Sequence, residues 1–237
     1  MNLYNRMPAK EVVILGSGDI GMIMARRLTL EGAHVKAVFE IQPYPSGLPR
    51  NIEQCLNDYG IPLFLSHTVT EIHGNARLSG VTVSEVDERM KPIPGTEKEY
   101  ACDTLILSVG LIPENELSLD AGVTLDQRTK GALVDEYFQT DVEGIFAAGN
   151  VLHVHDLVDF VSMEAEDLAE SAAEYVRTGR LPECPLAVRP DGNINHTVPQ
   201  RVSGTRAFKL SMRVNRPMKD CRVVVRQNGV ELASKKM

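Results

Sequence analysis

Val12-Val13-Ile14-Leu15-Gly16-Ser17-Gly18-Asp19-Ile20-Gly21 is the stretch that decides the fold of this chain. Its first four residues are apolar without interruption, which predicts a buried parallel strand, and a helical pattern begins directly behind the last glycine. The three glycines between them stand at Gly-x-Gly-x-x-Gly spacing. A strand, this loop and a helix in that order make up the fingerprint of a dinucleotide-binding site.

Each glycine of the loop has its own expected role. Gly16 permits the tight turn, Gly18 lets the backbone approach a pyrophosphate, and Gly21 lets the helix pack closely on the strand. The free N–H groups at the start of the helix would face the anion. We therefore expect the dinucleotide to lie against the loop that Gly16, Gly18 and Gly21 shape.

Glu40 ends the next predicted strand, residues 33–40, and lies 19 positions after Gly21. A strand-end carboxylate taken alone is most often simply solvated. Behind this glycine loop, however, an acidic side chain is expected to accept hydrogen bonds from the adenosine ribose hydroxyls. Because a carboxylate repels a 2′-phosphate and no Lys or Arg follows until Arg50, NAD is favoured over NADP.

The composition is that of an ordinary globular protein, with 43% hydrophobic and 24% charged residues in a chain of 237. No apolar run is long enough for a membrane span, and residues 1–10 lack a signal pattern, so we expect a cytoplasmic protein with no membrane partner. The cysteines lie far apart with no Cys-x-x-Cys pair, which argues against a disulfide framework, a zinc site and dithiol chemistry within the chain. They are Cys55, Cys102, Cys184 and Cys221.

Charge is distributed unevenly along the chain. Residues 185–237 hold 11 lysines and arginines against three acidic residues, a net charge of +8. The whole chain has a net charge of −7, so residues 1–184 carry −15. Phe208 is the only aromatic residue of this tail, and the tail therefore offers no stacking platform for a nucleic acid. We expect it to pack against the acidic body of the protein or against an acidic partner, and a homo-oligomer stays open.

The remaining pattern predicts an α/β protein. After a connector, residues 1–8, we expect a nucleotide-binding domain over 9–112, with a parallel sheet and a small β-meander. Its helix over 19–31 should cover the sheet with the apolar side chains of Ile20, Ile23, Met24, Leu28 and Leu30.

A second unit is expected over residues 113–184. Strands are predicted at 123–125, 132–134 and 144–150, followed by a helix over 156–178. The helix carries an alanine stripe that should pack on a sheet: Ala165, Ala169, Ala172 and Ala173. In the tail, 185–237, residues 208–214 alternate as a strand with one buried face, and Asn228-Gly229 predicts a hairpin turn.

Three motifs together carry a family resemblance: the glycine loop with Glu40, the segment Leu107 to Pro113, and the segment Thr140 to Asn150. With them the chain resembles the pyridine-nucleotide–disulfide oxidoreductase superfamily, the flavoproteins with two dinucleotide domains, FAD and NAD. Within it, the chain is most similar to the amine or amino-acid dehydrogenases and the sarcosine-oxidase α subunits.

The resemblance implies a Rossmann-like NAD domain over 9–112, the C-terminal half of an FAD-binding domain over 113–184, and a basic β-strand tail. It implies hydride transfer between NAD(H) and a flavin. By the same resemblance NAD would be held by Gly16, Ser17, Gly18, Asp19, Ile20, Gly21 and Glu40. Gly110 would lie beside the nicotinamide, and Gly149 and Asn150 would lie on the FAD side. No catalytic residue is identified.

Two departures from the family pattern shape the expectation. The glycine-rich loop for FAD that opens the family's fold does not precede residue 9, and the usual Gly-Asp is Gly149-Asn150 here. We therefore expect a fragment or subunit that is not catalytically complete alone, whose partner is an N-terminal FAD-domain segment or another subunit. FAD is then expected in the intact protein, and NAD in this chain.

Two further functions are compatible with parts of this sequence. One is a non-catalytic NAD-binding subunit or sensor that docks on a partner; another is a methyltransferase, which the segment 140–150 disfavours. His153-Val154-His155-Asp156 suggests either a metal site or a helix entry with Asp156 as N-cap, and the helix entry is favoured. The resemblance also places His153 or His155 near a flavin.

Overall fold

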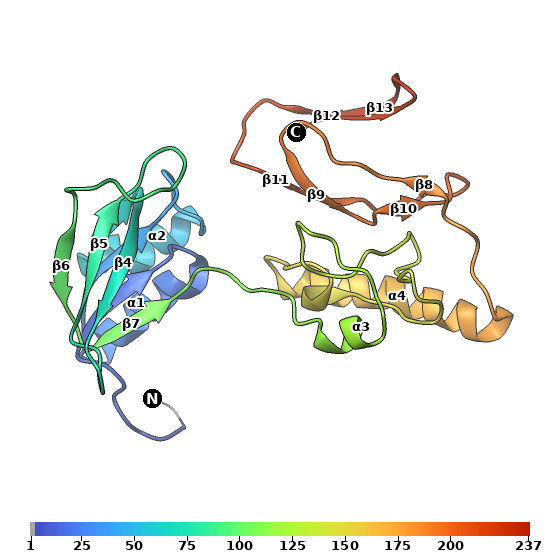
Figure 1. Ribbon diagram of the computed structural model, residues 1–237. Helices are drawn as coiled ribbons and strands as arrows, with labels where there is room; N and C mark the ends of the chain where they lie inside the picture. Colours follow the sequence, from blue (N-terminus) through green and yellow to red (C-terminus); the bar gives the residue numbers. More distant parts are fainter. Residues whose placement is uncertain (1–2) are drawn as a thin grey trace. The chain divides into compact units, whose positions relative to one another are not determined.

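The computed structural model describes residues 3–237, which form two compact units, one ending at Gly110 and one running from Leu111 to Met237 (Figure 1). None of the helices between residues 3 and 237 combines the length and the apolar character needed to span a lipid bilayer.

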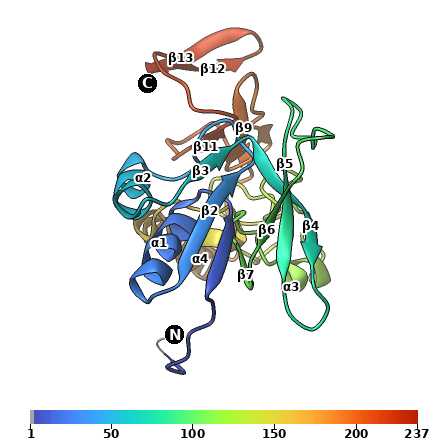
Figure 2. The same ribbon diagram turned by 90° about the vertical axis from the view of Figure 1, so that its left-hand side faces the viewer.

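A four-stranded parallel sheet forms the centre of the first unit, in the order β3-β2-β1-β7. The expected α/β class is confirmed, with a helix crossing over between β1 and β2 (Figure 2). The elements are β1 (Glu11–Leu15), α1 (Asp19–Leu30), β2 (His34–Glu40), α2 (Pro49–Cys55), the 3₁₀ turn η1 (Asn57–Tyr59), β3 (Leu63–Leu65) and β7 (Thr104–Leu107).

Both faces of this sheet are covered. On one face, Val12 and Ile14 of β1 pack with residues of α1 and α2. On the other face, Val13 packs with the antiparallel sheet β4-β5-β6. All three side chains are fully buried, as expected for a parallel strand between two layers. The covering sheet is the predicted meander: β4 (His67–His73), β5 (Gly80–Glu85) and β6 (Lys98–Ala101).

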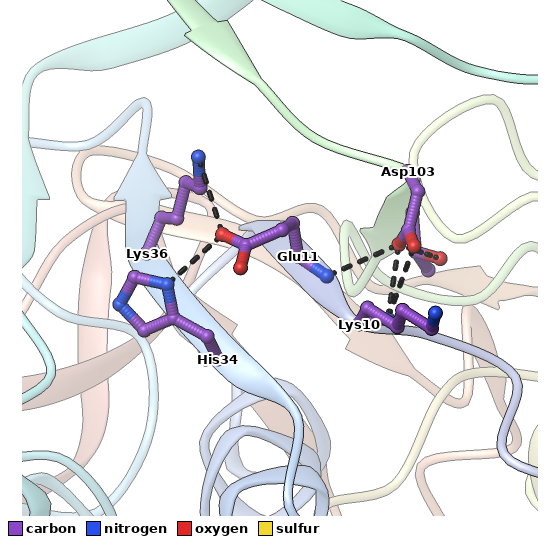
Figure 3. Close-up of polar contacts among 6 residues, drawn as sticks. Lys10, Glu11, His34, Lys36 and Asp103 are labelled. Atoms are coloured by element: carbon purple, nitrogen blue, oxygen red, sulfur yellow. Dashed lines mark hydrogen bonds and ion pairs between the residues drawn. The ribbon is translucent and has the colours of Figure 1, made fainter.

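Charged side chains tie the amino ends of the parallel strands together (Figure 3). Asp103, just before β7, accepts hydrogen bonds from the backbone N–H groups of Lys10 (3.1 Å) and Glu11 (3.2 Å). The carboxylate of Glu11 contacts His34 Nδ1 at 2.9 Å and Lys36 Nζ at 3.2 Å, both on β2. These backbone bonds, with that from Lys10 foremost, hold the pKa of Asp103 below its usual value.

The buried face of α1 differs from the predicted one. Met24 and Leu28 face the sheet as expected, but Ile20, Ile23 and Leu30 are 70%, 44% and 53% exposed. The helix is rotated so that its small residues approach the sheet, because Gly21 must lie against Gly16 and Ser108. The buried stripe is Gly21, Met22, Ala25 and Leu28.

The prediction of three strands before the long helix of the second unit was wrong. The segment 123–150 forms isolated bridges, Leu125 with Ala132, Gln139 with Phe146 and Asp135 with Arg201 of the tail, and then a 3₁₀ turn, η2 (Gly149–Val151). Side chains bend this segment, since Asp126 and Asp135 accept hydrogen bonds from backbone N–H groups two to four residues ahead. Such local bonds compete with ladder pairing.

The long helix, α4 (Val158–Thr178), was predicted within two residues, but its alanine stripe was not buried as expected. Ala165, Ala169 and Ala173 are exposed, and Ala172 is half-buried. Among the described residues of this unit no sheet lies against that stripe. The one fully buried residue of α4 is Glu164, which joins the helix to the segment before it.

The tail contributes to the core of the second unit. Val198 packs with Val123, Ala132, Val134 and Leu152. Backbone bonds from Gln200 and Arg201 to the carbonyl of Val134 tie the same segment down. The helices and strands of this region are α3 (Glu116–Asp120), β8 (Leu186–Ala187), β9 (Ile194–Val198), β10 (Arg201–Val202), β11 (Ser211–Val214), β12 (Arg222–Gln227) and β13 (Val230–Lys236).

The hairpin predicted at Asn228-Gly229 is confirmed: both residues have positive φ, and β12 pairs antiparallel with β13. The buried face predicted for 208–214 was wrong, because β11 pairs with β9 while Met212 and Val214 stay 37% and 41% exposed. Two cations of the tail do pair with acidic residues of the same unit: Lys209 with Asp167 at 2.7 Å and Arg213 with Asp156 at 2.9 Å.

Candidate functional site

The glycine loop lies at the point where the strand order of the parallel sheet reverses. From β1 the chain passes through α1 to β2 on one side, and β7 returns on the other side of β1. In open α/β sheets, ligands bind outside the carboxyl ends of the strands at this reversal. The first turn of α1, which begins at Asp19, directs its N–H groups there, and a helix leaves these groups without internal acceptors.

The three glycines serve different purposes. A Cβ at Gly16 would overlap the carbonyl oxygen of Ser108, and one at Gly21 would lie 2.7 Å from Gly16 O and 2.8 Å from Ser108 Cβ. A Cβ at Gly18 would have Ser108 Oγ as its nearest neighbour, at 3.5 Å. The packing of the protein itself therefore requires Gly16 and Gly21. Gly18 has room for a side chain, so its lack of one fits the approach of a ligand.

Glu40 lies against the loop rather than in solvent. Its Oε2 accepts hydrogen bonds from the N–H (2.9 Å) and the hydroxyl (2.5 Å) of Ser17, and its Oε1 accepts one from the N–H of Gln42 (2.9 Å). Glu40 is 5% exposed and Ser17 is fully buried. Since an ionised carboxylate has about four acceptor positions, Oε1 keeps one that no described group fills.

The segment after β2 also belongs to this site, and the sequence did not reveal it. Ser46 Oγ donates to Glu40 at 3.1 Å, and Gly47 N–H donates to Ser17 O at 3.0 Å. A Cβ at Gly47 would lie 2.7 Å from Asp19 Oδ1. The Pro-Ser-Gly composition of this turn was a signal for a tight approach, but not for what it approaches.

Two more loop positions have distinct environments. Asp19 Oδ1 accepts hydrogen bonds from Leu48 N–H (2.8 Å) and Asn51 Nδ2 (2.7 Å), so it holds the start of α2 in place. Ile20 is largely exposed on the open side of the loop. Gly110, three residues beyond β7, has φ +97° and no heavy atom within 4 Å of a Cβ position. Its conformation favours glycine, and space around it is open.

The positions expected on the FAD side are occupied by the chain's own groups. Gly149, at φ +70°, donates its N–H to Glu164 Oε2 at 2.6 Å. Asn150 accepts a hydrogen bond from the N–H of His155 at 3.1 Å through Oδ1. The sequence spacing predicted neither contact. The first depends on α4, which brings Glu164 back to the turn.

Glu164 also joins the two histidines. His153 Nε2 lies 2.9 Å from Oε1 and His155 Nε2 lies 3.0 Å from Oε2. Burial opposes the charge on Glu164, but hydrogen bonds from His153, Gly149 N–H and His155 outweigh it, so the pKa of Glu164 lies below its usual value. Asp156 is not the N-cap of α4 as predicted. That position is Leu157, and Asp156 pairs with Arg213 instead.

Comparison with known proteins gives a family for residues 2–174, which match the model described as Pyridine nucleotide-disulphide oxidoreductase. The chain is 28% identical over 150 residues to an NAD(P)H coenzyme A polysulfide/persulfide reductase of Pyrococcus horikoshii, covering 63% of this chain and 32% of that protein. It is 28% identical over 172 residues to a ferredoxin–NADP reductase of Ignicoccus hospitalis, covering 71% and 52%.

Among solved structures, the thioredoxin reductase of T. acidophilum superimposes with a TM-score of 0.60 at 28% identity, covering 70% of this chain and 53% of that one. The chain thus spans about half, or less, of the length of these relatives.

Proposed function

The chain belongs to the pyridine nucleotide-disulphide oxidoreductase family, and from that premise we propose that it is the NAD(H)-binding part of an oxidoreductase that moves hydride between NAD(H) and a flavin. Membership of this family implies FAD and NAD(P) as cofactors. The activity of the whole protein, and the roles of residues 9–112, 113–184 and 185–237, are part of the proposal.

The open position at Gly18 is the observation that carries this proposal. It stands at the start of α1, where unpaired N–H groups and the helix dipole favour a phosphate. Nothing in the packing of the described residues requires glycine there. A pyrophosphate that lies against the backbone does require it. The dinucleotide fits the residues present.

We propose NAD rather than NADP because Glu40 stands where the adenosine ribose would lie. Its Oε1 has an acceptor position for a ribose hydroxyl, once the segment after β2 moves aside. A 2′-phosphate would meet this carboxylate. The other groups described around it, the hydroxyls of Ser17 and Ser46, carry no charge to offset the repulsion.

The flavin is proposed for the intact protein and not for this chain alone. Gly149 N–H already bonds to Glu164 within the chain, so it is not free for an FAD, and Asn150 has no carboxylate to offer one. The sequence has one Gly-x-Gly-x-x-Gly loop, at 16–21. When bound, the flavin would exchange hydride with the nicotinamide, while this chain's residues bind and orient the NAD.

Titration calorimetry of the chain with NADH, NADPH and S-adenosylmethionine tests this proposal. NADH should bind most tightly, NADPH more weakly, and S-adenosylmethionine least. Tightest binding of S-adenosylmethionine would favour a methyltransferase, and a folded chain that binds no dinucleotide would overturn the proposal.

A second candidate is a non-catalytic NAD-binding subunit or sensor that docks on a partner. The observation that favours it is the hairpin β12-β13, in which every residue of β13 is exposed, because an uncovered two-stranded hairpin is marginal in water. The absorbance spectrum of the intact parent protein separates the two. A flavin spectrum that NADH bleaches supports the oxidoreductase, and its absence supports the sensor.

A further inference from the structure

A cluster of three side chains in the second unit lies outside the proposed NAD site. His153 and His155 follow η2, and Glu164 lies on the second turn of α4. One ligand atom from each of the three lies within 4.8 Å of the others. The side chains are 10%, 8% and 8% exposed.

The donor set is that of a transition-metal site. Two imidazole nitrogens and one carboxylate are the ligands of the catalytic zinc in many hydrolases, where a fourth position stays open. Bond lengths of 2.0–2.1 Å in a tetrahedron place neighbouring ligand atoms about 3.3 Å apart. The two histidine nitrogens lie 2.9 and 3.0 Å from different oxygens of Glu164, and one ligand atom from each residue lies within 4.8 Å of the others, so the three atoms would draw closer around a bound ion.

A second, independent observation comes from His196 on β9. The cavity that His153, His155 and Glu164 line has a volume of about 300 Å³, and His196 lines it as well. The His196 ring lies 6.2 Å from that of His153, centroid to centroid. Its Nδ1 is buried and has no hydrogen-bond partner among residues 3–237. His196 also lines a second hollow of this unit, and this Nδ1 can accept a hydrogen bond from, or donate one to, a ligand or a water molecule there or in this cavity.

Other charged groups of the cavity are already paired. Asp156 pairs with Arg213 at 2.9 Å and Asp167 with Lys209 at 2.7 Å. Glu164 is therefore the one carboxylate among the described residues of this cavity that pairs with histidines and with no Lys or Arg side chain. A hard cation such as Ca²⁺ or Mg²⁺ requires six or more oxygen ligands, which this nitrogen-rich cluster does not provide.

We propose that His153, His155 and Glu164 bind one divalent transition-metal ion, with Zn²⁺ the best match to the donor set. The fourth position opens into the cavity that His196 lines and takes water or a small ligand. The turn after η2 and the helix α4 are then joined by the metal rather than by hydrogen bonds alone. This site is independent of the proposed NAD site in the first unit.

Zinc binding by the chelator-stripped chain tests the proposal. Calorimetry should show one Zn²⁺ per chain, with a dissociation constant below micromolar. Glu164→Gln and His153→Gln should each weaken binding at least tenfold, because a metal site loses one of its three protein ligands. Co²⁺ in place of zinc should give visible bands of tetrahedral character in the wild-type chain, a readout that needs no variant.

The matched control is Glu11→Gln. Glu11 also lies 2.9 Å from a histidine nitrogen, His34 Nδ1, but this pair is exposed and has no second histidine (Figure 3). Its zinc binding should equal that of the wild type, as should that of Gly18→Val in the NAD site. Circular dichroism first establishes that each variant is folded. A folded wild type that binds no zinc, or equal binding in all variants, would overturn the proposal.

Discussion

The hydroxyl of Ser17 donates a 2.5 Å hydrogen bond to the carboxylate of Glu40, and this contact joins the glycine loop to the end of the neighbouring strand. The same carboxylate also accepts the N–H of Ser17. The residue proposed to select the dinucleotide therefore also holds the shape of the loop that is proposed to bind it.

Ser17→Ala should lower the free energy of unfolding by about 1–3 kcal/mol, because it leaves a buried carboxylate with one donor fewer. Urea denaturation measures this. Ser162→Ala, at an exposed position of α4, is the control and should change stability by under about 0.5 kcal/mol. Equal stability of both variants would mean that the Ser17 contact contributes nothing.

Glu40→Arg should weaken NADH binding and shift the preference toward NADPH, since a guanidinium attracts a 2′-phosphate that the carboxylate repels. The measurement is the ratio of the two dissociation constants, which is insensitive to a partial loss of folded protein. Ser17→Ala should leave this ratio unchanged, because it does not alter the charge. An unchanged ratio in Glu40→Arg would remove Glu40 from the dinucleotide site.

Gly18→Val should reduce NADH affinity more than tenfold while the midpoint of thermal unfolding stays near that of the wild type. The added side chain fits the protein but occupies the space of the pyrophosphate. Gly21→Ala makes the contrast, because its Cβ would lie 2.7 Å from Gly16 O and should destabilise the fold. The idea fails if Gly18→Val binds NADH as well as the wild type does.

Asp135→Asn should stabilise the second unit at pH 7. Burial raises the pKa of Asp135, although the N–H groups of Tyr137 and Gln139, which bond to its Oδ1, act to lower it. A raised pKa means that the folded state favours the protonated form, so the wild type loses stability as the pH rises above about 3.8, the ordinary value. The advantage of the variant should shrink as the pH falls toward that value. Urea unfolding of the wild type and the variant at pH 7 and near pH 3.8 measures this advantage. A difference in stability that does not change with pH would contradict the raised pKa of Asp135.

Cys184 should react slowly with iodoacetamide. Burial, together with the charge of Asp135, raises the pKa of its thiol to about 11, so at pH 8 only about one thiol in a thousand is ionised. Mass spectrometry of the Cys184 peptide, with free glutathione in the same mixture, gives the relative rate. A rate equal to that of glutathione would show that the thiol is not held in its neutral form.

Much of the first unit was predictable because its signals are local. An uninterrupted apolar run such as Val12 to Leu15, followed at once by a glycine, is typical of a strand buried on both faces, and the glycine spacing defines the turn that follows. The hairpin at Asn228-Gly229 was predictable for the same reason, since both residues readily adopt positive φ. The second unit was less so, because Asp126 and Asp135 replace strand pairing with side-chain bonds to nearby backbone.

The amino-acid sequence was enough to predict the parallel strands and the glycine loop, because strand burial and turn geometry depend on neighbouring residues. The fold was needed to show which glycine has open space beside it, since Ser108, which lies against Gly16 and Gly21, is far along the chain. It also decided that Glu164 meets His153 and His155, because α4 must fold back on the turn before it. Contacts of that kind depend on how whole elements pack.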